Sequence, residues 1–283
     1  MQLIHGKPIA ERLLQTVAER IRSRGVTPGL AALLVGDDPA SEIYVGLKAR
    51  AAESVGMYFE KQVLPATATT AEVQAVVRSL NGRPDIHGII VQLPLPDSID
   101  ADAVIATIDP SKDADGFHPE TVNRFLAGLS SVPPAFPRAL LMLLESPGVS
   151  LQGKHAHIFA NSALFARVMK TALGRLGVQS EDTLDRMTRE SVAQLKSADI
   201  VITATGNPHF LTGDMVRDGA IILDGGITRV GTEVVGDADP ESFASAEGYL
   251  TPVPGGVGPV TVALLIAHTA ELGLGEDLEG SIL

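Results

Sequence analysis

The chain of 283 residues contains no cysteine, so it can form neither a disulfide framework nor a thiolate metal site. Its 7 histidines include no pair with the H-x-x-x-H or H-E-x-x-H spacing of common zinc sites. His155 and His157 are two residues apart on an expected strand, and we interpret them as solvent-facing residues. From these absences we predict no metal site.

Long apolar runs and basic blocks are missing as well. No apolar run approaches the roughly eighteen residues that a membrane span needs, and the start of the chain has no basic region followed by an apolar stretch. Lys and Arg number 22 against 34 Asp and Glu, which gives a net charge of −12. We therefore expect a soluble, cytoplasmic protein that binds neither membrane nor nucleic acid and acts on a small molecule.

What the chain does contain is a regular alternation of short apolar runs and helical stretches. The apolar runs lie at residues 31–35, 88–93, 155–160, 199–204 and 220–224. This βα rhythm predicts an α/β fold in which helices cover parallel sheets. The chain is also long enough for two domains, each with its own core.

Two clusters of proline and glycine mark the boundaries of these halves. The stretch S-V-P-P-A-F-P at 131–137 predicts an irregular connection, and we place the change of domain near it or slightly before it. A second cluster at 251–261 precedes an apolar helix expected at 262–272, which is free to return to the first domain. We find no internal repeat and no low-complexity tract.

The segment from Pro39 to Gly56 is predicted to be a helix with Ser41 as its N-cap. It places Tyr44 and Lys48 one turn apart on one face. An apolar stripe of Ile43, Leu47 and Ala51 runs beside them. The pair would then lie at the margin of a core, where a partly desolvated lysine can act as a base. The alternative is a solvated lysine whose stem the tyrosine covers, and this segment alone favours it.

Three further segments carry candidate binding residues. Gln92 lies near the carboxyl end of an apolar strand, where ligands bind in open α/β sheets, although its amide could equally be satisfied by the backbone of the turn. The stretch I-D-P-S-K-D-A-D-G-F-H-P at 108–119 is, by composition, a solvated loop. P-G-G-V-G-P at 254–259 leaves backbone amides uncovered for a flat ligand, but a bare loop fits as well.

Together these segments resemble the bifunctional methylenetetrahydrofolate dehydrogenase/methenyltetrahydrofolate cyclohydrolase family. The matching signatures are V-G-D-D-P-A-S-E-I-Y-V-G-L-K, G-I-I-V-Q-L-P-L-P, K-D-A-D-G-F-H-P and T-P-V-P-G-G-V-G-P-V-T. The resemblance implies a three-layer α/β folate-binding catalytic domain at 1–125, completed by a C-terminal helix at 259–283. It also implies a Rossmann-like nicotinamide domain at 126–258, and a homodimer.

The resemblance assigns roles to matching residues. Lys48 would be the central acid and base that opens the methenyl bridge, and Tyr44 would stack on the folate. Gln92 would hydrogen-bond Lys48 and tune it, and Asp115 would hold the polar edge of the pterin. The glycine-rich loop adds further folate-binding residues, which are Pro254, Gly255 and Gly256.

The chain departs from the family at the expected phosphate-binding turn. The family has G-R-S-x-x-x-G-R-P, which cradles the cofactor phosphates at a helix N-terminus, whereas this chain has A-N-S-A-L-F-A-R-V. Alanine stands at both glycine positions, Ala160 and Ala166, and Asn161 stands where an arginine would contact the 2′-phosphate of NADP. Losing such a contact costs about 1.5–3 kcal/mol. The cofactor-binding candidates that remain are Ser162, Arg167 and Gly258.

Other departures concern the neighbouring segments. Residues 178–185 include Glu181, Asp182 and Asp185 and are expected to make a poor strand. One acid there would favour NAD by binding a ribose hydroxyl, but three would repel either cofactor. P-A-F-P-R-A at 134–139 replaces the family's P-C-T-P-x-G. We therefore rank three outcomes: the absence of productive nucleotide binding comes first, binding of NAD second and binding of NADP third.

The predicted function is therefore a tetrahydrofolate-dependent one-carbon enzyme with an intact pterin site. Its simplest form is a cyclohydrolase, in which water adds to the methenyl carbon and Lys48 moves the protons. Three alternatives remain open. They are transfer of a methylene unit to another substrate without a redox cofactor, the full NAD(P)-dependent bifunctional reaction, and a non-catalytic folate-binding relative.

Overall fold

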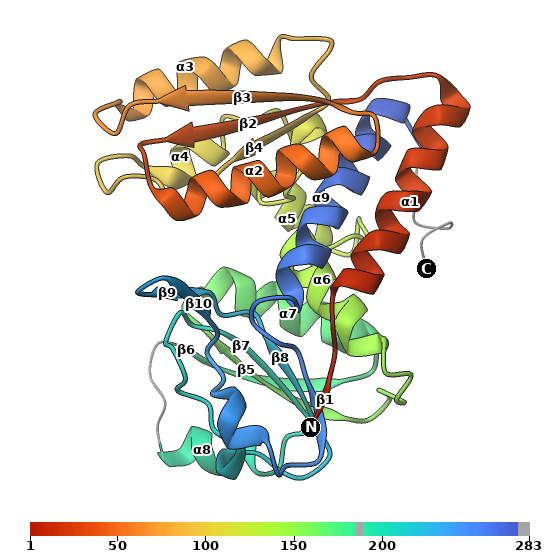
Figure 1. Cartoon of the computed structure of the whole chain (residues 1–283), viewed down its shortest axis with the longest axis vertical. Helices are drawn as coiled ribbons and strands as arrows, with labels where there is room; N and C mark the ends of the chain where they lie inside the picture. Colours follow the sequence, from red (N-terminus) through yellow and green to blue (C-terminus); the bar gives the residue numbers. More distant parts are fainter. Residues whose placement is uncertain (185–188, 277–283) are drawn as a thin grey trace. The chain divides into compact units, whose positions relative to one another are not determined.

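The computed structural model describes residues 1–184 and 189–276, and the chain divides into two compact units. One comprises Ala10–Ala135 with Val262–Leu283, and the other comprises Met1–Ile9 with Phe136–Thr261. We call them the three-stranded unit and the six-stranded unit after their main sheets (Figure 1). The predicted boundary at residue 125 lies ten residues before this division.

The three-stranded unit is built on a parallel sheet in the order β3-β2-β4. Its strands are β2 (Gly29–Val35), β3 (Tyr58–Leu64) and β4 (Gly88–Val91). The helical elements are α1 (Lys7–Arg24), α2 (Pro39–Ser54), α3 (Thr70–Asn81), α4 (Ala101–Ile105), a 3-10 turn at Pro110–Lys112, α5 (Pro119–Leu126) and α9 (Val257–Leu274). Every residue of β2 and β4 is buried, as expected for parallel strands covered on both faces.

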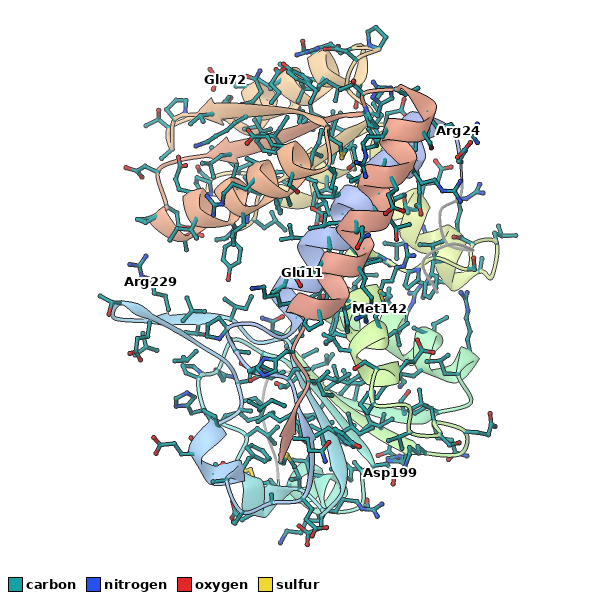
Figure 2. All side chains as sticks on the ribbon, turned by 45° about the vertical axis from the view of Figure 1, so that its right-hand side comes forward. Glu11, Arg24, Glu72, Met142, Asp199 and Arg229 are labelled. Atoms are coloured by element: carbon teal, nitrogen blue, oxygen red, sulfur yellow. The ribbon has the colours of Figure 1, made fainter. Side chains whose placement is uncertain are left out.

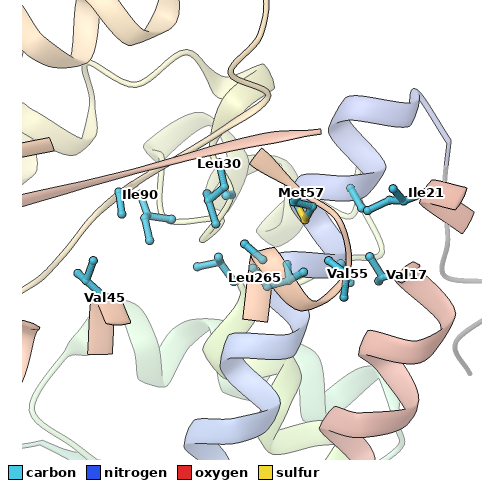
Figure 3. Packing of buried hydrophobic residues seen from close by; sticks show 14 residues of the cluster. Val17, Ile21, Leu30, Val45, Val55, Met57, Ile90 and Leu265 are labelled. Carbon is cyan, nitrogen blue, oxygen red and sulfur yellow. The ribbon is translucent and has the colours of Figure 1, made fainter. Parts of the chain in front are cut away.

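Alternate residues of β2 divide between two hydrophobic cores, one on each face of this sheet. Leu30 and Ala32 pack with residues of α1, α2 and α9 (Figure 3). Ala31 and Leu33 pack on the opposite face with residues of α3 and α4. Figure 2 labels Glu72 in the first turn of α3, where it forms a capping box with Thr69. These contacts make the three-layer arrangement that the βα pattern predicts.

By length and composition alone, helix α9 is long and apolar enough to cross a membrane. Half of this 18-residue helix is buried inside the protein. The expectation of no such stretch was wrong because the polar residues in α9 are small or uncharged over most of its length. Leu265, Ile266, Ala267 and Ala270 belong to the core that α9 shares with α1 and α2. A core helix of a globular protein meets the same criterion.

The six-stranded unit has a parallel sheet in the order β1-β11-β8-β7-β5-β6. Its strands are β1 (Gln2–Leu3), β5 (His155–Ala160), β6 (Gln179–Leu184), β7 (Ile200–Ala204), β8 (Ala220–Asp224) and β11 (Gly248–Leu250). Its helices are α6 (Ala135–Glu145), α7 (Ala163–Arg175) and α8 (Arg189–Leu195), with 3-10 turns at Gly213–Met215 and Pro240–Phe243. A separate antiparallel hairpin is formed by β9 (Thr228–Val230) and β10 (Glu233–Val235).

The order of these strands reverses at β5, which has β6 on one side and β7 on the other. Such a reversal is the place where doubly wound sheets bind ligands, at the carboxyl ends of the strands. The first nine residues, which we expected in the catalytic domain, group with the other unit. They belong to the six-stranded unit because β1 pairs with β11.

Two further expectations about this sheet were wrong. Residues Gln179–Leu184 form strand β6, which pairs along its length with β5. As an edge strand it needs only one partner, and the Asp182 carboxylate accepts a hydrogen bond from Lys170 Nζ at 2.7 Å. Asp185 lies outside the described residues. His157 is fully buried, with Nε2 2.9 Å from Thr183 Oγ1, because both faces of β5 are covered.

The β9–β10 hairpin is joined to the sheet by two buried carboxylates, Asp224 and Asp237. Asp224 Oδ1 accepts hydrogen bonds from the backbone N–H groups of Gly226 and Asp237, and its Oδ2 accepts one from Ala238. The pKa of Asp224 is raised to about 6, mainly by burial and in smaller part by the charge of Asp237, against the lowering effect of the backbone hydrogen bonds that the carboxylate accepts. Asp224 is therefore a group whose protonation is linked to folding.

This linkage predicts a pH-dependent stability. Between its ordinary value of 3.8 and about 6, Asp224 binds a proton in the folded state that it has lost in the unfolded state. The stability that Asp224 contributes is therefore fully present below pH 3.8, and it is lost as the pH rises through about 6. We expect this group to lower the free energy of unfolding by about 3 kcal/mol between about pH 4 and pH 7.

Urea unfolding at several pH values measures this contribution, and Asp224→Asn should remove it from the slope. Asp218→Asn is the matched control, because Asp218 is exposed on the loop before β8. The control should keep the wild-type slope. An Asp224→Asn curve parallel to the wild-type curve would contradict the raised pKa.

Candidate active site

Helix α2 carries the predicted pair Tyr44 and Lys48, but it packs differently from the prediction. Its N-cap is Asp38, whose carboxylate accepts a hydrogen bond from Ser41 N at 2.8 Å, so Ser41 was the wrong N-cap. The buried positions of α2 are Ser41, Val45 and Ala52. In the expected stripe, Ile43 is 58% exposed and Leu47 is 41% exposed. Of the expected stripe only Ala51 packs against the core, so the core contacts a face of the helix turned away from Ile43 and Leu47.

Lys48 and Gln92 are joined by a hydrogen bond between α2 and the end of β4. Lys48 Nζ donates to Gln92 Oε1 at 3.1 Å, and Gln92 Nε2 donates to the Leu93 carbonyl at 2.7 Å. The backbone of the turn thus satisfies the amide nitrogen, and this bond turns the amide oxygen toward the lysine. The interpretation that the turn's backbone satisfies this amide holds for its nitrogen, and the functional interpretation of Gln92 stays a prediction.

A recess of about 140 Å³ lies against this pair in the three-stranded unit. Its polar lining is Lys48, Gln92, Asp113 and Asp115. Its apolar lining includes Ile89, Ile90, Val91, Leu93, Ile105, Ile108 and Phe117. A cation, a fixed amide and the Asp115 carboxylate among apolar side chains suit a flat ligand with a polar edge.

The loop after α4 is organised by Asp113, a residue that the sequence reasoning missed. Asp113 is 2% exposed, and its carboxylate accepts hydrogen bonds from the N–H groups of Gly116, Phe117 and His118 at 2.8–3.2 Å. Lys112 Nζ donates to the carbonyl of Arg83 at 2.7 Å. The expectation of a solvated loop was therefore wrong. The spacing of an acid three to five residues before G-F-H is the signal that could have identified this turn.

Asp115 faces the recess from this loop. Loss of hydration is the largest effect on the pKa of Asp115 and raises it, and the charge of Lys48 lowers it. Asp113 raises this pKa and His268 lowers it. Burial also raises the pKa of the Tyr44 phenol, one turn before Lys48 on α2. Lys48 thus shares the recess with a carboxyl group whose protonation depends on its neighbours.

The predicted cofactor residues lie in the six-stranded unit, at the carboxyl end of β5. Ser162 is the N-cap of α7, and its Oγ accepts a hydrogen bond from Phe165 N at 3.3 Å. Asn161 donates from Nδ2 to the Thr205 carbonyl at 3.3 Å, which ties it to the end of β7. Arg167 is exposed on the next turn of the helix.

The alanines at the expected glycine positions cause no strain in this fold. Among the described residues other than glycine, His209 is the one with a positive φ, so Ala160 and Ala166 have ordinary backbone conformations. Both are buried, at 0% and 1% exposure, so their methyl groups fill space inside the unit. The first N–H groups of α7 remain available for a phosphate. These residues fit a dinucleotide, but Asn161 offers no cation for a 2′-phosphate.

The glycine-rich loop also lies in the six-stranded unit. Gly256 N donates to the Pro252 carbonyl at 2.7 Å, and Gly6 N donates to the Gly255 carbonyl at 2.8 Å. A Cβ on Gly256 would lie 2.7 Å from the Pro252 oxygen, and Gly255 has φ +108°. Tight packing therefore requires glycine at 256, and the positive φ favours glycine at 255. Pro254 is exposed, and a Cβ on Gly258 would meet open space.

Two family models match the chain. The catalytic domain of tetrahydrofolate dehydrogenase/cyclohydrolase matches residues 4–115, and the NAD(P)-binding domain of the same enzymes matches residues 134–274. The chain belongs to the tetrahydrofolate dehydrogenase/cyclohydrolase family. Membership confirms the resemblance inferred from the four signatures, and it confirms the two-domain α/β fold with a Rossmann-like half.

Individual members of the family are similar over nearly the whole chain. The bifunctional protein FolD of Moorella thermoacetica is 43% identical over 275 residues, covering 95% of this chain and 98% of that protein. The crystal structure of FolD from Campylobacter jejuni has a TM-score of 0.90 at 37% identity, covering 97% and 99%. The Trypanosoma brucei enzyme, solved with NADP cofactor and inhibitor, has a TM-score of 0.91 at 30% identity, covering 96% and 97%.

No group of three or more His, Asp or Glu residues in the described part of the chain could hold a metal ion. The roles that the resemblance assigns to Lys48, Tyr44, Gln92 and Asp115 stay predictions. What the geometry adds is that Lys48, Gln92 and Asp115 line one recess.

Proposed function

We propose that this chain interconverts one-carbon derivatives of tetrahydrofolate, and that its cyclohydrolase step takes place at Lys48. The observation that carries the proposal is the hydrogen bond from Lys48 to a Gln92 amide whose orientation is fixed by Leu93, beside Asp115 in one recess. In the reaction, water and 5,10-methenyltetrahydrofolate give 10-formyltetrahydrofolate and a proton.

Lys48 is the group that moves protons in this step. As water adds to the methenyl carbon, the amine takes a proton from the water, and it returns one to the ring nitrogen when the carbon–nitrogen bond breaks. Gln92 Oε1 holds Nζ in place throughout, because an amide oxygen accepts from the lysine in either protonation state. When it is ionised, the Asp115 carboxylate has no hydrogen to donate and acts only as an acceptor. It therefore binds the N–H groups on the polar edge of the pterin.

The dehydrogenase step requires a nicotinamide dinucleotide, which when bound accepts a hydride from the methylene group. Ser162 and the first N–H groups of α7 would hold its pyrophosphate, with Arg167 on the following turn. We propose that this step uses NAD in preference to NADP, because Asn161 has no charge to pair with a 2′-phosphate. Buried methyl groups at Ala160 and Ala166 give no steric reason for the loss of the dinucleotide.

The cofactor preference is tested with Asn161→Arg. We expect this substitution to raise kcat/KM for NADP⁺ about tenfold to a hundredfold relative to NAD⁺, which corresponds to one arginine–phosphate contact. The measurement is the rate of nicotinamide reduction with 5,10-methylenetetrahydrofolate. Asn161→Ala is the control, since it removes the bond to Thr205 without adding a charge. Wild-type reduction that is as fast with NADP⁺ as with NAD⁺ would overturn the preference.

Homodimer formation and a cytoplasmic location stay predictions that rest on the sequence.

A further inference from the structure

His268 of α9 contacts the loop that presents Asp115. Its Nδ1 lies 3.0 Å from the carbonyl oxygen of Ala114, the residue that precedes Asp115. A carbonyl oxygen can only accept a hydrogen bond, so Nδ1 must carry the hydrogen. In the neutral ring Nε2 is then unprotonated, and taking up a proton there gives the ring its positive charge.

Three hydrogen bonds fix the backbone on both sides of Asp115. His268 binds the Ala114 carbonyl, Ala135 N donates to the Asp115 carbonyl at 3.0 Å, and Gly116 N donates to Asp113 Oδ1 at 3.1 Å. These three bonds fix the peptide groups on both sides of the Asp115 Cα. The His268 bond is the one that comes from a side chain distant in the sequence.

The charges near Asp115 come from each element around it. Helix α2 contributes the cation Lys48, the loop itself contributes the anion Asp113, and α9 contributes the imidazole of His268. The end of β4 contributes Gln92, which is neutral. Burial and Asp113 favour the protonated carboxyl group, whereas Lys48 and His268 favour the carboxylate.

We propose that His268 is a positioning residue that keeps Asp115 in place and ionised for recognition of the N–H edge of a pterin. This inference rests on the proposed function, because it assumes that Asp115 receives the pterin. It adds a residue to which neither the sequence motifs nor the resemblance gave a role. An ionised carboxylate can accept two hydrogen bonds from a pterin edge, and a protonated one loses part of this capacity.

The test replaces His268 with Asn and measures the Kd of 5-formyltetrahydrofolate by calorimetry. We expect the Kd to rise about threefold to tenfold at pH 6, because the Ala114 carbonyl loses its hydrogen-bond donor and the Asp115 carboxylate loses a neighbour that favours it. The rise should be smaller at pH 8.5 than at pH 6, because a neighbour that favours the carboxylate has less effect as fewer protons are available to the carboxyl group. The kcat at saturating folate should stay near the wild-type value.

His118→Asn is the matched control, because His118 caps α5 from the same loop and Asn can take over that cap. It should leave the Kd unchanged at both pH values. An equal rise of the Kd at both pH values in His268→Asn would mean that His268 only supports the fold, and an unchanged Kd would mean that it has no role. Either outcome overturns the inference.

A second measurement is independent of folate. Nitrogen-15 NMR of the imidazole rings, with the His268 signal assigned from His268→Asn, should show the tautomer protonated at Nδ1. The tautomer protonated at Nε2 would contradict the bond to Ala114. Failure of the wild type to bind 5-formyltetrahydrofolate at any pH would contradict the proposed function instead, and the NMR result would still decide whether the bond exists.

Discussion

Replacing Lys48 with methionine should lower the kcat of the cyclohydrolase reaction at least about a thousandfold, within the range of general acid–base catalysis. Methionine keeps most of the length of the side chain but has no proton to give or accept. Asp115 remains in place to bind the pterin, although the loss of the Lys48 charge raises its pKa, so the Kd of 5-formyltetrahydrofolate should stay within about tenfold of the wild-type value. Hydrolysis of 5,10-methenyltetrahydrofolate, followed by its absorbance, measures the first quantity and calorimetry the second.

Two further variants separate the possible roles of the lysine. Lys48→Arg keeps the positive charge but cannot lose a proton near neutral pH, so it should be nearly as inactive as the methionine variant. Lys61→Met is the control, because Lys61 lies on β3 and pairs with Glu42 on the surface of the same unit. It should keep full activity. Undiminished turnover in Lys48→Met would show that the proposed mechanism is wrong.

The βα rhythm of the sequence predicted the parallel sheets because both are consequences of local pattern. Continuous apolar runs such as 88–91 become strands buried on both faces, and those faces need helices to cover them. Edge position is not local, however. The acids of β6 are tolerated because this strand has one neighbour and because Lys170 of α7 reaches Asp182. His157 is buried for the opposite reason, since β5 lies inside the sheet.

The candidate site shows the same limit. Motif resemblance identified Lys48, Gln92 and Asp115, which come from three segments that the fold brings to one recess. It did not reveal Asp113 or His268. Both residues act by binding backbone groups of other residues. Asp113 accepts hydrogen bonds from N–H groups within the turn at 113–118, and His268 of α9 binds the carbonyl of Ala114. A charged residue that binds backbone inside a loop has no signature in composition, and this loop was therefore taken for a solvated one.

Replacing Asp113 with alanine should lower the free energy of unfolding by about 3–6 kcal/mol. Three N–H groups, those of Gly116, Phe117 and His118, would lose the acceptor they share, and each buried unsatisfied donor costs about 1–3 kcal/mol. The expected loss lies in the lower part of the summed range because the bonds from Phe117 and His118 are only partly buried. Because the same turn presents Asp115, folate binding should also be lost in any fraction that remains folded. Urea unfolding measures the stability, and calorimetry with 5-formyltetrahydrofolate measures the binding.

Asp109 provides the matched control, since it lies in the same loop and caps the 3-10 turn by accepting from Ser111 N. It is exposed, so water can replace it, and Asp109→Ala should cost about 1 kcal/mol and leave binding intact. Asp113→Asn should fall between the two, because one amide oxygen can serve only part of the three donors. Equal losses in Asp109→Ala and Asp113→Ala would mean that the loop draws its shape from elsewhere. Asp115 would then owe its position to the bonds from His268 and Ala135.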